Sequence, residues 1–191
     1  MAKQYKRHPK QINEAYDADA EIIVMSSERW FAISTDHVDF VNDYMVDVSF
    51  FDCGYHSVCV SLSDIAAVGA DPEGILLSVC VPKETSSENI EEFAKGVSFA
   101  AEKYGTFVLG GDTTASGEFS VTSTVFGFMP CQKALLRKGA MPGDSIFLSG
   151  LAGRANGRAY ANATGREASA PKFSIEPRIE LGRLLRDLAT S

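Results

Sequence analysis

Six short stretches of the chain are rich in apolar, β-branched and aromatic residues and are bounded by glycine, proline or polar clusters. This pattern is typical of β-strands. The predicted strands are residues 21–25, 30–35, 74–81, 106–109, 119–129 and 145–149. The first two are joined by Ser26-Ser27-Glu28-Arg29, which favours a hairpin. Residues 36–52 show no clean period and predict a loop with a short helix.

Three other stretches follow the helical period. Residues 86–104 keep one apolar face, with Thr85 and Glu88 suited to a capping box and Gly105 to the helix end. Residues 179–188 place four leucines on one side. Residues 56–68 predict a mostly buried helix that carries a polar stripe of Ser57, Ser61 and Asp64. Asp64 therefore lies where the helix should be packed.

The pattern changes after Ser149. Three glycines at positions 150, 153 and 157 lead into small residues and then into a polar stretch that ends at Pro171. We therefore expect two domains, residues 1–149 and the beginning of an incomplete second domain at 150–191. The order of elements predicts an α/β (α+β) fold in which helices cover a mostly antiparallel sheet.

Composition narrows the possible functions. The net charge is −7 and the pI is about 5.0, which argues against a nucleic-acid partner because no basic stripe is present to meet phosphates. No apolar run is long enough to span a membrane, and the basic N-terminus has no apolar region behind it, so neither a membrane helix nor a signal peptide is expected. The four cysteines match no zinc spacing and indicate free thiols in a cytoplasmic protein.

The candidate chemistry lies in acidic residues placed at the ends of apolar runs. They are Asp36, Asp64 and the Asp112 of Gly110-Gly111-Asp112-Thr113-Thr114. Each has a structural alternative: an Asx turn for Asp36, a helical carboxylate reaching solvent or a lysine for Asp64, and a tight turn for Asp112. No Lys or Arg occurs between Arg29 and Lys83, so the acidic groups there need another counter-charge. Separated carboxylates with glycines and hydroxyls beside them favour a Mg²⁺ and phosphate site, and we expect the three to converge.

Four segments in this order resemble the thiamine-monophosphate kinase family of the aminoimidazole-ribonucleotide-synthetase-like (PurM-like) superfamily. They are Ser34-Thr35-Asp36, Ser61-Leu62-Ser63-Asp64-Ile65-Ala66-Ala67-Val68-Gly69-Ala70, Gly110-Gly111-Asp112-Thr113-Thr114 and Arg137-x-Gly139-Ala140-x-Pro142-Gly143-Asp144. The resemblance implies a PurM-like N-terminal domain and Mg²⁺-dependent transfer of the ATP γ-phosphoryl group to thiamine monophosphate, giving thiamine diphosphate. It also implies a homodimer in which the sheets of two subunits join into a barrel.

The resemblance carries roles to particular positions. Asp36, Asp64 and Asp112 would be the catalytic carboxylates, and Asp43 stands at the family's substrate position. ATP would contact Gly110, Gly111, Asp112 and Arg137. The implied metal ligands are Asp19, Ser34, Thr35, Asp36, Asp64 and Asp112.

The chain also departs from the family pattern, mostly on the acceptor side. Ala18 stands where the family has an acidic residue, and Asp43 stands where the substrate loop of the family has a histidine. Ser61 replaces the Asn that usually comes before the Leu-Ser-Asp motif. Ala115 replaces the Arg that is common after the double threonine, and Arg154 replaces an expected acidic residue after Ser149. Two alternatives therefore stay open. One is an ATP-using superfamily enzyme with another acceptor, of the hydrogenase-maturation or ribonucleotide-synthetase type. The other is a non-catalytic nucleotide-binding or dimerisation module, since family members continue well beyond Ser191.

Overall fold

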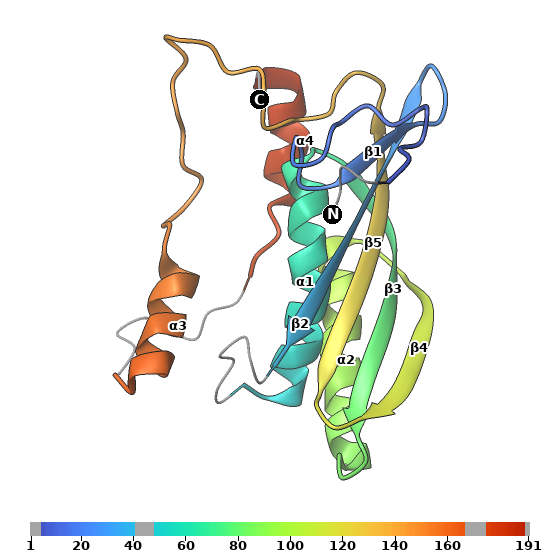
Figure 1. Cartoon of the computed structure of the whole chain (residues 1–191), viewed down its shortest axis with the longest axis vertical. Coiled ribbons are helices and arrows are strands. Elements are labelled where there is room, and N and C mark those ends of the chain that lie inside the picture. The colour runs from blue at the N-terminus through green and yellow to red at the C-terminus, as the bar shows by residue number, and fades with distance from the viewer. Residues whose placement is uncertain (1–4, 41–47, 167–174, 190–191) are drawn as a thin grey trace.

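The computed structural model describes residues 5–40, 48–166 and 175–189. One five-stranded sheet forms its centre, with the spatial order β1-β2-β5-β3-β4 (Figure 1). The strands are β1 (Glu21–Val24), β2 (Arg29–Asp39), β3 (Asp71–Pro82), β4 (Val108–Ser116) and β5 (Ser120–Pro130). Only the β3–β4 pair is parallel, so the mostly antiparallel sheet and the first hairpin are confirmed.

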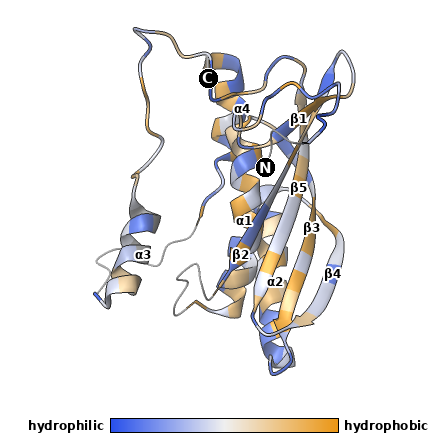
Figure 2. Ribbon diagram, viewed as in Figure 1, coloured by the Kyte–Doolittle hydropathy of each residue, from blue (hydrophilic) through white to orange (hydrophobic). Residues whose placement is uncertain are grey.

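Helices cover one face of this sheet. α1 (Phe50–Ala67) and α2 (Ser87–Tyr104) lie together on the same side in Figure 1. The core between them and the strands is apolar and fully buried, and includes Ile22, Leu62, Ile65, Ile75 and Val125. Figure 2 shows apolar residues along α1, β3 and β5. The opposite face, hereafter the uncovered face, has no helix of the described residues packed on it.

The two long helices approach each other closely at a pair of glycines. A Cβ placed on Gly54 would lie 2.1 Å from the Phe93 carbonyl oxygen, and one on Gly96 would lie 2.0 Å from the Phe51 carbonyl oxygen. Because each glycine meets backbone of the other helix, no side chain fits at either position. α1 begins earlier than the predicted residue 56, since Ser49 and Asp52 form a capping box that the sequence reading missed.

The predicted span of α2 is confirmed, and Gly105 ends it with a φ of 67°. The predicted cap is off by one residue: the N-cap is Ser86, whose hydroxyl accepts a hydrogen bond from the Asn89 amide, and not Thr85. α4 (Ile179–Leu188) has the predicted bounds. It packs through Gly182, where a Cβ would lie 2.1 Å from the Ala66 carbonyl oxygen, whereas Leu184 and Leu188 of the leucine side are exposed.

One prediction about the remaining chain is wrong, and one helix was not predicted. Residues 145–149 do not form a strand; Ile146 and Phe147 are almost fully exposed, and no strand of the described residues lies alongside to pair with them. After them comes a helix that the sequence reading did not predict, α3 (Arg154–Thr164), which stands apart from the sheet in Figure 1. The domain boundary near Ser149 stays a prediction. None of the helices in the described ranges is long and apolar enough to cross a membrane.

Candidate functional site

The site is centred on two carboxylates from different elements. Asp36 lies inside β2, not at the end of a strand, because β2 continues to Asp39. Asp64 comes from the last turns of α1. Asp36 shares hydrogen bonds with Asp64 and Ser61, and the Ser34 hydroxyl donates to Asp64 Oδ2 at 2.5 Å. Strand alternation explains the arrangement, since Ser34 and Asp36 both point to the face that α1 covers.

Burial dominates the electrostatics of this carboxylate pair. It raises the pKa of Asp64 from 3.8 to about 6; the Ser34 hydrogen bond opposes the rise, while the charges of Asp36 and Asp19 add to it. Burial also raises the pKa of Asp36, against hydrogen bonds from Asp64 and Ser61. None of the described interactions that shift these two pKa values comes from a Lys or Arg. Among these described interactions, no Lys or Arg therefore balances the negative charge of the pair.

Two serine hydroxyls connect the surroundings of the carboxylate pair to β5. Ser61 and Ser123 are fully buried, their Oγ atoms lie 2.5 Å apart, and the Ser61 hydroxyl also reaches the Ser123 carbonyl oxygen at 3.1 Å. Thr35 points the other way: its hydroxyl contacts Thr124 Oγ1 at 2.9 Å on the uncovered face. Of the neighbouring predicted ligands, Ser34 therefore lies with the carboxylate pair, and Thr35 lies on the opposite face of the same strand.

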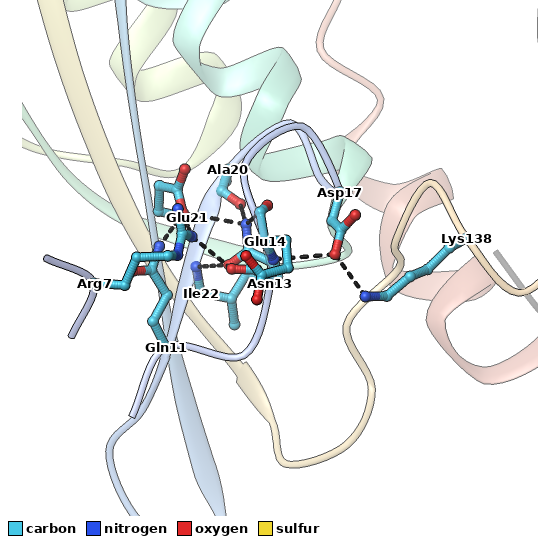
Figure 3. A network of polar contacts seen from close by, with 9 residues as sticks. All are labelled: Arg7, Gln11, Asn13, Glu14, Asp17, Ala20, Glu21, Ile22 and Lys138. Carbon is cyan, nitrogen blue, oxygen red and sulfur yellow. Dashed lines mark hydrogen bonds and ion pairs between the residues drawn. The ribbon is translucent and has the colours of Figure 1, made fainter. Parts of the chain in front are cut away.

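Asp19 and Arg137 form an ion pair although 118 residues separate them in sequence. Asp19 is close enough to Asp64 for its charge to raise the pKa of Asp64. Next to this ion pair, Asp17 binds Lys138 at 2.6 Å (Figure 3). The structure thus brings a predicted metal ligand and a predicted ATP contact together beside the carboxylate pair.

Asp112 does not join this group within one chain. The segment Gly110-Gly111-Asp112-Thr113-Thr114 lies inside β4 rather than in a loop after a strand. β4 and β2 are separated by β5 and β3, so Asp112 and Asp36 are about 14 Å apart across the sheet at the usual strand spacing. Asp36 lies opposite Ser123, and the same row of paired residues continues through Leu77 to Gly111 on β4. Asp112 is the next residue along β4. Because successive residues of a strand point to opposite faces, Asp36 and Asp112 do so too. The expected convergence of Asp36, Asp64 and Asp112 is therefore wrong for a single chain.

Both glycines of that segment have a structural cause. The β3–β4 register shifts between Ile75 and Leu76, opposite Val108 and Gly110, and Gly110 takes a φ of 153° there. A Cβ on Gly111 would lie 1.8 Å from the Leu77 carbonyl oxygen. The glycines accommodate a bulge in the strand pair. Whether their amides also approach a ligand stays a prediction.

Oxygen donors define what the carboxylate pair can bind. Two half-buried carboxylates and the Ser34 hydroxyl offer the hard ligands that Mg²⁺ prefers, and Mg²⁺ keeps several of its own waters. Within the described ranges, no three His, Cys, Asp or Glu side chains are close enough together to form a complete metal cage. The donors therefore fit a cation that is shared with water or with phosphate oxygens. Asp43 lies outside the described residues.

Sequence reasoning missed several residues here. Ser61 was visible as part of the polar stripe of α1, and Ser123 is a hydroxyl at a buried position between Val121 and Val125 of β5. That alternation is a signal that could have been found. The Asp17–Lys138 contact has no comparable signal in the sequence.

Comparison with known proteins defines the class to which this fold and site belong. The chain belongs to the AIR synthase related proteins, whose N-terminal-domain model matches residues 17–129. Within that class it is similar to thiamine-monophosphate kinases. It is 34% identical over 182 residues to the one from Escherichia coli strain K12, covering 91% of this chain and 55% of that protein. It is 34% identical over 152 residues to the one from Rhodopirellula baltica, covering 79% and 43%.

Solved structures with a similar fold include thiamine-monophosphate kinases. The thiamine-monophosphate kinase of Stenotrophomonas maltophilia K279a has a TM-score of 0.77 and 28% identity, over 96% of this chain and 61% of that one. The AaThiL protein complexed with AMPPCP and TMP has a TM-score of 0.80, at 22% identity over 91% and 58%, and this likeness concerns the fold. The chain spans about half the length of the curated relatives it matches.

Proposed function

We propose that this chain carries the Mg·ATP-binding part of a thiamine-monophosphate kinase, which transfers the ATP γ-phosphoryl group to thiamine monophosphate and forms thiamine diphosphate. The observation that carries the proposal is the half-buried Asp36–Asp64 pair, which has no protein cation among its described partners. It occurs in a chain that is 34% identical to thiamine-monophosphate kinases. A buried pair of like charges is costly, and a divalent cation removes that cost.

Each residue then has a defined role. Asp36 and Asp64 would hold Mg²⁺ through carboxylate oxygens, Asp19 would contribute its negative charge from beside them, and Ser34 orients Asp64 through its 2.5 Å hydrogen bond. Arg137 supplies a fixed charge with several donors to the ATP phosphates. Mg²⁺, when bound, would neutralise the polyphosphate, so the protein's contribution would be to position two anions and stabilise the charge between them. Asp43 stands on the acceptor side.

A second copy of the chain would bring an Asp112 to the strand that carries Asp36. β1 pairs only with residues 30–33 of β2, and no described strand occupies the same edge of β2 at residues 34–39. The outer edge of β4 is likewise unpaired among the described residues. We propose a homodimer in which β4 of one copy lies along residues 34–39 of the other. Thr35 and Asp112 both lie on the uncovered face, so this arrangement brings them together across the interface.

The uncovered face has the character of a buried surface. Phe31, Phe126 and Phe128 form an aromatic cluster there, with ring centroids 5.7 Å (Phe31–Phe126), 5.6 Å (Phe31–Phe128) and 6.4 Å (Phe126–Phe128) apart. Leu76 on the inner strand β3 is 46% exposed. Closure of two such sheets into a barrel would bury these side chains and satisfy both strand edges.

The proposal is tested by Mg²⁺-dependent ADP release, with and without thiamine monophosphate, on this chain and on a longer form that includes the second half found in the relatives. We expect release that requires thiamine monophosphate in the longer form, and loss of Mn²⁺ or Mg²⁺ binding in Asp36→Asn and Asp64→Asn. Asp187→Asn is the matched control, because Asp187 is a surface carboxylate paired with Lys133.

Other results would support the alternatives. Turnover of ATP with a different acceptor would favour another superfamily enzyme, which the substitutions at Asp43, Ser61 and Ala115 make the second candidate. Mg·ATP binding without turnover in both forms would favour a non-catalytic module. Unchanged metal affinity in both carboxylate variants would overturn the metal assignment.

A further inference from the structure

Arg137 lies in a part of the chain that has no regular structure. Residues 131–150 contain no helix or strand, so the position of Arg137 depends on a few individual contacts. Its backbone amide donates to the Asp17 carbonyl oxygen at 2.6 Å, and two residues earlier the Leu135 amide donates to the Val68 carbonyl oxygen at 3.2 Å. Its guanidinium meets Asp19. Two of these contacts come from the turn that contains Asp17 and Asp19.

Asp17 holds this turn and the Arg137 segment together. Its Oδ2 accepts from the Glu14 amide at 3.0 Å and from Lys138 Nζ at 2.6 Å (Figure 3). Through its backbone oxygen and its side chain, Asp17 therefore contacts two successive residues of the other segment.

Asn13 fixes the base of the same turn. Its side chain is almost fully buried, and its Oδ1 accepts from the Ile22 amide at 2.9 Å while its Nδ2 donates to the Ala20 carbonyl oxygen at 3.4 Å. Arg7 closes the arrangement from outside through the Asn13 carbonyl oxygen at 2.5 Å and Glu21 at 3.0 Å. Figure 3 shows these side chains converging from the N-terminal segment and β1, with Lys138 reaching in from the other segment.

We propose that Asn13, Asp17 and Lys138 are positioning residues for the nucleotide site: they hold Arg137 next to Asp19, so that a phosphate contact and a carboxylate beside the metal site are preorganised together. This inference rests on the proposed function. The substrate it concerns is a nucleoside triphosphate bound with a divalent cation. None of these three side chains needs to contact the nucleotide, because their contacts within the protein are enough to position Arg137 and Asp19.

A substitution at Asp17 separates two explanations, because a long-range charge effect and a positioning effect would change the affinity for Mg·ATP in opposite directions. Removing a negative charge close to a polyanion site should tighten binding of Mg·ATP if only long-range charge mattered. Removing the Asp17 carboxylate, which holds the neighbouring Lys138, should loosen the Arg137 segment and weaken the binding of Mg·ATP. Asp17→Asn keeps the side-chain size and isolates the charged contact with Lys138.

The experiment measures the dissociation constant of a non-hydrolysable Mg·ATP analogue by calorimetry. We expect Asp17→Asn and Lys138→Met to bind about threefold to fivefold more weakly, the size expected for a partly exposed ion pair. Lys138→Arg should bind almost as the original chain does. Lys133→Met is the matched control, because Lys133 lies in the same irregular segment and forms an exposed ion pair with Asp187 at 2.9 Å; its binding should not change.

A second readout does not depend on the ligand. Hydrogen exchange at the Arg137 amide should be faster in Asp17→Asn and Asn13→Ala, while amides in α2 keep their protection. If the original chain binds no Mg·ATP analogue, the proposed function is wrong and this inference falls with it. If the original chain binds and Asp17→Asn binds equally well or more tightly, only the positioning role is overturned. Unchanged exchange at the Arg137 amide would overturn it as well.

Discussion

At the scale of single residues, the proposed chemistry depends on where two carboxylates are buried. Asp64 is on a helix and Asp36 is on a strand, and the fold holds them within hydrogen-bonding contact of each other. Protonation of one member removes the like-charge repulsion, and a bound cation would do the same at higher pH. The pair is therefore a site at which pH and metal binding should be linked.

The first prediction concerns stability against pH in the presence of a chelator. The pKa of Asp64 is raised from 3.8 to about 6 in the folded chain. Its contribution to stability is therefore fully present below about pH 4, is lost as pH rises through about 6, and is unfavourable above it. Asp64→Asn should lose this dependence, so the melting temperature of the variant should exceed that of the original chain at pH 8 by more than at pH 4.

Mg²⁺ provides the control for this prediction. Adding it at pH 8 should raise the melting temperature of the original chain and not that of Asp64→Asn. If the difference in melting temperature between the two proteins is the same at pH 4 and pH 8, the carboxylate pair does not titrate as described.

At the scale of elements, glycines set how closely the helices pack. α1 and α2 meet through Gly54 and Gly96, each against backbone of the other helix, and α4 meets α1 through Gly182. Asp71 then fixes α4, since both Arg183 and Arg186 bind its carboxylate. These contacts hold α1, and with it Asp64, in place against the sheet.

The second prediction is that Gly96→Ala destabilises the chain by about 2–3 kcal/mol, because the new methyl group would have to displace the backbone of α1. The Cβ would lie 2.0 Å from the Phe51 carbonyl oxygen. Gly157→Ala is the control: it is also a helical glycine, and a Cβ there meets nothing within 4 Å. That variant should be unchanged or more stable by up to about 1 kcal/mol. Urea unfolding measures both, and equal effects would contradict the close-approach argument.

At the scale of the whole molecule, the sheet is covered on one face only. The uncovered face carries the aromatic cluster and Leu76, and two strand edges have no neighbour within the described residues. Asp112 lies on this face and away from Asp36. Within one chain Asp112 is remote from β2, so only the proposed homodimer would bring an Asp112 to the strand that carries Asp36.

The third prediction is that Leu76→Glu converts a homodimer into a folded monomer, because a charge would be placed where the two sheets meet. Leu188→Glu is the control, since Leu188 on α4 is 79% exposed and lies away from the uncovered face. Sedimentation or light scattering measures the mass, and circular dichroism verifies folding. A dimer that survives Leu76→Glu would exclude this face as the interface.

Local patterns in the sequence determined a large part of this protein. The bounds of α2 and α4 and the β1–β2 hairpin followed from periodicity and turn residues, and acidic residues in apolar settings pointed to Asp36 and Asp64 as candidate ligands. These signals act over a few residues, so the chain carries them before it folds. The capping box of Ser49 and Asp52 is an equally local signal.

Only the tertiary structure decided which of these residues meet. The strand assignment of Gly110-Gly111-Asp112-Thr113-Thr114 depends on pairing with β3, and the separation of Asp112 from Asp36 depends on the strand order. The contacts of Asp64 with Ser34 and of Arg137 with Asp19 join residues 30 and 118 positions apart. Sequence patterns of short range hold no information on such pairs, because their formation depends on how packed helices and strands close the chain between them.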